Sequence, residues 1–383
     1  MKHTAYSIIF LNIMLYSTLL SMDNPHFYRA TNIFAEPRIE HNYLTSFDAT
    51  LGGGSTTKSR NSDHATVPLL DIYGPNVLVI NNIPTTFSID GTFKILESNL
   101  SYAQNLAYGL LLFFHLPVRS LNIKNVSFMP TNNQISFTND ALQLLSHNGV
   151  LTCQSKETGI GDFTSLVGIT HNYQNTQVLD FIDGTVTAGI LAPTGKKKNE
   201  HELFSLPLGY NGHWGFPFSG ALSLGAYEWI TVGAYANALL FVKTHRFMNL
   251  KTTIDQSGII KLGFGTVSVD KGTVWNTGLY FKADHFAYGL SLTAAYSCAG
   301  EQKSTLNPLK SSMLDYVVIN SDPILKGWKM HTIHFVAEYD FAQQNSKMGL
   351  RVSAFYNRQI GGTRVFKTNM SGGSFGLDIG WDL

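Results

Sequence analysis

The chain has 383 residues, of which 44% are hydrophobic, 12% are aromatic and only 14% are charged. Disordered chains need high charge and few aromatic residues, and coiled coils need about half Ala, Glu, Lys, Leu and Arg, so both classes are excluded. A net charge of +1 gives no electrostatic reason to expect a nucleic-acid partner. The low charge, with raised glycine and aromatic content, favours one large β structure whose surface faces something other than water.

The amino terminus predicts a secretory signal. Lys2 and His3 precede an apolar run over 5–20, and Ser21 is a small residue at which a signal peptidase could cut. The alternative is an uncleaved anchor, for which the run is short. We therefore expect a signal peptide over 1–21, a periplasmic or lumenal segment over 22–37 and an outer-membrane barrel over 38–383. Beyond residue 21 no apolar run of 18 residues occurs, which excludes a helical membrane bundle.

The rest of the chain alternates apolar and polar residues with period two, which is typical of β-strands. Residues 375–383 show the pattern well, with apolar residues at odd positions and Gly or Asp at even ones. The predicted strands are 39–51, 85–96, 102–116, 163–173, 180–192, 214–226, 229–243, 275–284, 286–297, 331–341, 347–357 and 375–383.

Strand length and charge favour a transmembrane β-barrel over a soluble sandwich or lipocalin, because strands that span a bilayer need about 9–11 residues. The links also alternate between long and short, with short turns expected at 97–99, 175–179, Tyr227, 283–284 and 343–346. The sequence thus predicts an all-β, antiparallel barrel of about twelve strands (10–14) in outer-membrane lipid. Long extracellular loops and short periplasmic turns join the strands, and the 117–159 link holds a helical turn over 139–145.

The last strand ends Trp381-Asp382-Leu383, which is similar to the carboxyl-terminal signal read by the barrel-assembly machinery. That signal usually ends in Phe or Trp, and Leu383 departs from it. The barrel-assembly machinery is therefore an expected partner.

Candidate catalytic strings have structural explanations. Ser146-His147-Asn148 holds the residue types of a hydrolase triad, but triad members are normally brought together by the fold. Asp284-His285 fits a solvated turn, and a strand sends His331 and His334 to opposite faces. We expect no enzyme activity, no cofactor and no metal.

Charged residues at inward-facing positions are the candidate pore lining. The set comprises Glu338, Asp340, Lys347, Arg351, Asp378 and Asp382. With a turn centred on 344–345, Glu338 lies opposite Arg351, and Asp340 lies diagonally from Arg351 and Lys347. These charges either set the ion preference of an open pore or form an ion-pair ladder in a closed lumen.

Two short motifs carry a family resemblance. Gly161-Asp162-Phe163 is followed by Pro193-Thr194-Gly195-Lys196 and then by glycine-rich alternating strands. Over about 160–383 the chain resembles the outer-membrane proteins of the MetA pathway of phenol degradation, which are distant relatives of FadL-type transporters of hydrophobic compounds. By the strand count, Gly161 and Pro193 lie at the same rim of the barrel, where they end strand pairing.

The resemblance implies passive uptake of small hydrophobic or aromatic compounds. The alternative is a structural or adhesion barrel with a closed lumen, and a barrel hydrolase is a third class. The sequence does not specify the oligomeric state.

Overall fold

The computed structural model describes residues 45–80, 83–130, 137–147, 149–152, 154–174, 179–227, 229–287, 289–309, 315–341 and 348–380. Its main sheet holds 14 strands, of which β4 and β7 lie outside the ring and twelve close into a barrel. The ring strands are β1 (Thr45–Thr56), β5 (Ile83–Asn105), β6 (Leu110–Pro130), β8 (Phe163–Gln174), β9 (Phe181–Ala192), β10 (Gly215–Ala226), β11 (Ile230–Phe241), β14 (Val274–Ala287), β15 (Leu290–Glu301), β17 (Lys329–Asp340), β18 (Met348–Thr363) and β20 (Met370–Ile379).

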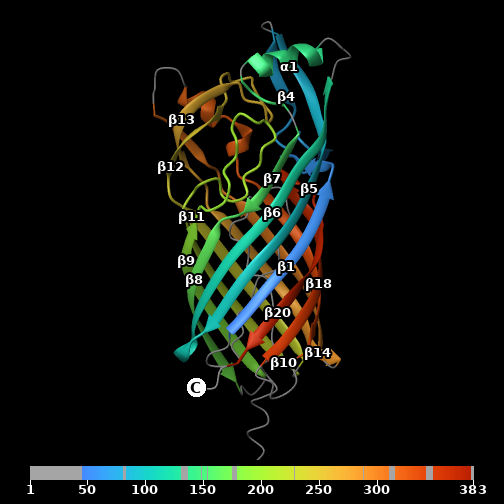
Figure 1. The fold of residues 1–383 in the computed structure, drawn as a ribbon, viewed down its shortest axis with the longest axis vertical. Coiled ribbons are helices and arrows are strands. Elements are labelled where there is room, and N and C mark those ends of the chain that lie inside the picture. The colour runs from blue at the N-terminus through green and yellow to red at the C-terminus, as the bar shows by residue number, and fades with distance from the viewer. Residues whose placement is uncertain are drawn as a thin grey trace, which may run out of the picture.

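Each ring strand pairs antiparallel with the ring strands before and after it in the chain, and β1 pairs with β20 to close the barrel (Figure 1). Short connections follow β5, β8, β10, β14 and β17, at the end where β1 begins and β20 ends. We call this the turn end and the opposite one the loop end. The predicted all-β architecture and its twelve strands are confirmed.

The outside of the barrel is apolar. On β15, Leu292 is 44% exposed, whereas its neighbours Ser291 and Thr293 are buried on the inner face. Large apolar side chains are exposed on the other strands as well, among them Val167, Val186, Leu222, Val232, Leu279, Phe335, Leu350 and Phe375. Such a surface is expected of a barrel that spans a bilayer, since soluble proteins rarely expose large continuous apolar patches. Separately, none of the described helices is long and apolar enough to cross a membrane.

Two predicted turns are wrong. Residues 97–99 lie inside β5, and the chain turns instead at the short helix η2 (Ala107–Gly109). Ala283 and Asp284 lie inside β14, which continues to Ala287. In both places the polar residues that indicated a turn are buried on the inner face of a strand: Glu97 is 1% exposed and Asp284 is 3% exposed.

The first strands are also longer than predicted. β1 continues to Thr56, and β5 and β6 pair from the turn end up to Phe87 and Pro130, well beyond the neighbouring strands. Residues 39–44, the signal peptide and the 22–37 segment lie outside the described residues.

The long connections build a folded cap at the loop end (Figure 1). Its strands are β2 (Lys58–Arg60), β3 (Thr66–Pro68), β4 (Asn76–Ile80), β7 (Ser155–Ile160), β12 (Thr244–Leu250), β13 (Gly263–Asp270), β16 (Thr305–Pro308) and β19 (Val365–Phe366). The helices are α1 (Phe137–His147), which contains the predicted helical turn, α2 (Tyr316–Asn320) and η3 (Pro323–Leu325). Leu69, Leu78, Phe93, Leu145, Phe204 and Phe366 belong to one buried apolar cluster in the cap. Because Phe93 belongs to β5, the cap packs against the long ring strands at the loop end in one hydrophobic core.

Candidate functional site

The two motifs of the family resemblance meet at the rim of the barrel. Phe163 pairs with Ala192 at the upper end of the β8–β9 ladder, so the Asp162 and Pro193 positions lie directly beyond it. The backbone N–H of Gly195 donates to Asp162 Oδ1 at 2.9 Å, and the N–H of Tyr210 donates to Asp162 Oδ2. Asp162 is fully buried. Its carboxylate therefore fixes the 193–214 loop at two points.

The remaining motif residues complete this rim cluster. Thr194 Oγ1 donates to the carbonyl of Gly161 at 2.8 Å and accepts from the N–H of Phe163. Lys196 forms an ion pair with Glu157 on β7. A Cβ atom on Gly195 would stand 2.9 Å from Asp162 Oδ1, so the close approach of this backbone to the carboxylate requires glycine. The motif residues thus connect the rim of the β8–β9 ladder to the 193–214 loop.

A buried ion pair that the sequence did not indicate supports the same loop. Arg119 Nε on β6 donates to Glu97 Oε2 on β5 at 2.7 Å, and both side chains are 1% exposed or less. Arg119 Nη1 donates to the carbonyl of Leu208. The wall of the barrel thus holds the 193–214 loop from a third side.

The cap encloses a cavity of about 260 Å³. Segments far apart in the sequence line it: the link after β1, the 193–214 loop, the β12–β13 region, the link after β15 and β19. Part of the wall is apolar, formed by Leu70, Leu203, Phe204, Leu325, Trp328 and Phe366 among others. Ligand sites combine such walls with a few polar groups, typically at volumes of about 300–1,000 Å³, so this cavity suits a small ligand.

The charged part of the wall is mostly basic. Six Lys and Arg residues line the cavity against three carboxylates. The basic residues are Lys198, Arg246, Lys261, Lys271, Lys326 and Arg364, and the acidic ones are Glu200, Glu301 and Asp322. Ion pairs join Arg246 to Glu200 at 3.1 Å, Lys261 to Asp322 at 2.8 Å and Lys271 to Glu301 at 2.8 Å.

Burial shifts two titratable groups of the cavity. Burial, together with the positive charge of Lys271, lowers the pKa of His213 to about 4. It also lowers the pKa of Lys261, against the opposing effect of Asp322. Near neutral pH the His213 imidazole is therefore uncharged, and the formal excess of three positive charges comes from Lys and Arg.

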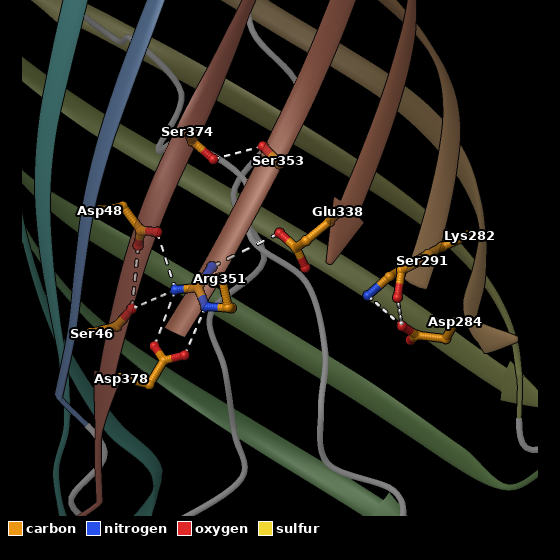
Figure 2. A network of polar contacts seen from close by, with 10 residues as sticks. All are labelled: Ser46, Asp48, Lys282, Asp284, Ser291, Glu338, Arg351, Ser353, Ser374 and Asp378. Carbon is orange, nitrogen blue, oxygen red and sulfur yellow. Dashed lines mark hydrogen bonds and ion pairs between the residues drawn. The ribbon is translucent and has the colours of Figure 1, made fainter. Parts of the chain in front are cut away.

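A second polar cluster lies on the inner face near the turn end (Figure 2). Arg351 Nε donates to Asp378 Oδ2 at 2.7 Å, and Arg351 Nη2 donates to Asp378 Oδ1 and Asp48 Oδ1 at 3.1 Å each. Nη2 also donates to Ser46 Oγ at 3.1 Å, and Nη1 lies 3.9 Å from Glu338 Oε2. We call these five residues the Arg351 network. It joins β17, β18, β20 and β1, across the seam where the first and last strands meet.

The predicted register of this hairpin is wrong by two residues. Asp340, rather than Glu338, lies opposite Arg351, and Glu338 lies opposite Ser353. A shift of two keeps every side chain on its face, so Glu338, Asp340 and Arg351 still share the inner face. Lys347 and Asp382 lie outside the described residues.

Asp284 also differs from its prediction as a solvated turn residue. Its Oδ1 atom lies 2.7 Å from Lys282 Nζ and accepts from Ser291 Oγ at 2.8 Å (Figure 2). Lys282 is 1% exposed. The ladder between β14 and β15 shifts register between Ala283 and Ala287, so Asp284 stands beside a bulge rather than in a turn.

The structure does not bring the remaining catalytic and metal-ligand candidates together among the described residues. Ser146 and His147 are consecutive, exposed residues at the end of α1, and consecutive helix residues do not face each other. On β17, His334 is buried, and its Nε2 lies 2.7 Å from Ser297 Oγ. His331 Nδ1 instead forms a hydrogen bond with the hydroxyl of Tyr296, an exposed residue.

Comparisons with known proteins support the fold. No family model and no curated protein matches the sequence. Among solved structures, the COG4313 outer membrane channel from Pseudomonas putida F1 has a TM-score of 0.53 at 13% identity, over 88% of this chain and 96% of that one. The translocator domain of the autotransporter NalP from Neisseria meningitidis scores 0.37 at 12% identity, over 89% of each chain. The toluene transporter TodX of P. putida scores 0.32 at 11% identity, over 89% of this chain and 90% of that one. The first likeness is one of fold, and the other two scores are too low to carry an argument.

Proposed function

We propose that this chain is a channel of the bacterial outer membrane that admits small hydrophobic or amphiphilic compounds by passive diffusion, without catalysis. The observation that carries the proposal is the cavity at the loop end, whose wall is part apolar and part basic. A barrel with an apolar exterior and the fold of a protein described as an outer membrane channel supports this assignment. With the loop end facing the outside, the cavity would be the first site that an entering solute meets.

One observation favours a second candidate, a structural barrel with a closed lumen. The charged side chains near the turn end are almost fully buried: Arg351 is 1% exposed and Asp378 is 4% exposed. Charged side chains this deeply buried on the inner face leave little room for a solute beside them. The two candidates therefore differ in whether solute passes the turn end.

Liposome swelling separates them. Vesicles that hold the refolded protein should swell in solutions of small neutral aromatic solutes faster than empty vesicles, and single-channel conductance should appear in planar bilayers. A closed structural barrel gives neither signal.

A matched pair of variants connects permeation to the cavity. Ile324 lines the cavity and is 42% exposed, so Ile324→Trp adds bulk to the cavity without overpacking a core. Leu309 is similarly exposed but does not line the cavity. Ile324→Trp should slow swelling, and Leu309→Trp should leave it unchanged. Equal rates for wild type and both variants would contradict a route through the cavity.

A further inference from the structure

The cavity wall has more positive charge than its own carboxylates compensate. Lys198 and Arg246 share the carboxylate of Glu200, at 3.5 Å and 3.1 Å, so one carboxylate faces two cations. Arg364 lines the same cavity, and its guanidinium donates hydrogen bonds to the carbonyl of Gly327 and the hydroxyl of Ser62. Both acceptors are uncharged groups. An anionic ligand in the cavity could form charge-assisted hydrogen bonds with the cations that these carboxylates leave uncompensated, so the excess favours an anion.

A second observation points the same way. Lys251 follows β12, two residues beyond the cavity residue Asn249, and is only 5% exposed, and no carboxylate among the described residues forms an ion pair with it. After burial, the positive charge of Lys251 is one of the causes that lower the pKa of the cavity residue Lys261. Lys261 itself is held by Asp322, which leaves the charge of Lys251 uncompensated.

Another part of the wall is suited to hydrocarbon. Leu203 and Phe204 belong to the buried apolar cluster of the cap, and Trp328 adds a large aromatic surface. A ligand that satisfies both parts has a compact apolar body and one negative charge.

We propose that the cavity binds small organic anions of this kind, such as aromatic carboxylates, with the anionic group against the basic residues Lys198, Arg246 and Lys261. This rests on the proposed function and narrows it, because it names the class of solute that the channel retains at its loop end. A neutral compound of the same shape contacts the same apolar wall but gains nothing from the excess charge.

Binding of benzoate and benzamide tests the proposal, because the two probes have similar shape and differ in charge. The full chain in lipid nanodiscs is titrated with each compound by isothermal titration calorimetry. Benzoate should bind about tenfold more tightly than benzamide, a difference of about 1.4 kcal/mol. The preference should shrink with added salt, since salt screens charge.

Two variants assign the effect to residues. Lys198→Gln removes one lining charge while Glu200 keeps Arg246, and Lys251→Gln removes a charge that has no described partner. Each should weaken benzoate binding several-fold and leave benzamide binding unchanged. Lys243→Gln is the control, because that lysine is 64% exposed, pairs with Asp270 and does not line the cavity. The gel shift on heating verifies that every variant is folded.

The outcomes separate this proposal from the proposed function. Equal affinities for the two probes, or equal losses in the control and the two variants, overturn the anion site. If benzoate does not bind while vesicles with the protein still swell in benzamide, the anion site is wrong and the channel function stands. If vesicles do not swell but benzoate binds selectively, the channel function fails and the anion site stands.

Discussion

Replacing Arg351 by methionine should destabilise the barrel at its seam. The guanidinium makes a two-point contact with Asp378 on β20 and further bonds to Asp48 and Ser46 on β1, and it is 1% exposed. Methionine keeps much of the side-chain volume and removes every donor. Removing one partner of a buried ion pair typically costs about 3–5 kcal/mol, because the other charge is left uncompensated.

The size of the effect depends on the carboxylates that remain. Asp378 is 4% exposed, so Arg351→Met should lower the free energy of unfolding by about 3 kcal/mol or more. Adding Asp378→Asn removes one of the carboxylates left uncompensated, and the double variant should recover at least about 1 kcal/mol of that loss.

Urea unfolding in lipid vesicles, followed by tryptophan fluorescence, measures both changes. Arg358→Met is the matched control, since Arg358 lies on the same strand with an exposed side chain. The control should unfold at the wild-type urea concentration. If Arg351→Met also does so, the network does not hold the seam, and Arg351 is free to serve conduction alone.

Three further changes test other parts of the molecule. Leu350→Arg places a charge on the lipid face and should cost about 2–4 kcal/mol, whereas Ser353→Arg faces the polar interior, so only the first should reduce the folded fraction on unheated gels. Asp162→Ala leaves two backbone donors of the 193–214 loop without their acceptor, at about 1–3 kcal/mol each, and should raise hydrogen exchange at Gly195 and Tyr210 more than Asp63→Ala does. Burial contributes most to lowering the pKa of His213 from 6.5 to about 4, so the folded loop favours the neutral imidazole. The stability that this preference contributes is complete above pH 6.5 and is lost as the pH falls toward 4. Hydrogen exchange of that loop, corrected for intrinsic rates, should therefore rise between pH 7 and pH 4.5, and a flat profile contradicts a buried neutral imidazole.

The period-two pattern was sufficient to predict the barrel because one face of each strand meets lipid. In a chain with so little charge, apolar residues at every second position, as at Leu350 and Val352, indicate a strand face in contact with lipid. The even strand number followed from the alternation of long and short links. The loop and turn ends could thus be told apart from the sequence alone.

The misplaced turns share a physical cause. Polar residues usually indicate turns, but a barrel interior also buries polar residues inside strands. Glu97 accepts from Arg119 and from Asn99 Nδ2 at 2.8 Å, and Asp284 is matched by Lys282. In both places the polar side chains contact one another on the inner face of the barrel. The strand therefore continues where the polar residues had indicated a turn.

The cavity could not be predicted because its wall comes from separate connections. Lys198, Lys261 and Asp322 lie on three different loops, and no local pattern indicates that they meet. The rim cluster was easier to anticipate, since Asp162 and Gly195 stand at the ends of two neighbouring strands. Local sequence specified the strand ends, whereas the packing of the cap specified the cavity.

The two polar sites carry opposite charge, and this determines how a charged solute meets each of them. The cavity has an excess of basic residues, whereas Asp48, Glu338, Asp340 and Asp378 lie around Arg351 on the inner face near the turn end. An organic anion is attracted by the first site and repelled by the second, because like charges oppose entry. Binding at the loop end and passage through the turn end are therefore separate properties, and tight binding of benzoate is compatible with slow entry of benzoate. A neutral aromatic solute lacks the attraction of the basic residues at the cavity but meets no charge barrier at the turn end. Compared with benzoate, benzamide should therefore bind more weakly and permeate faster.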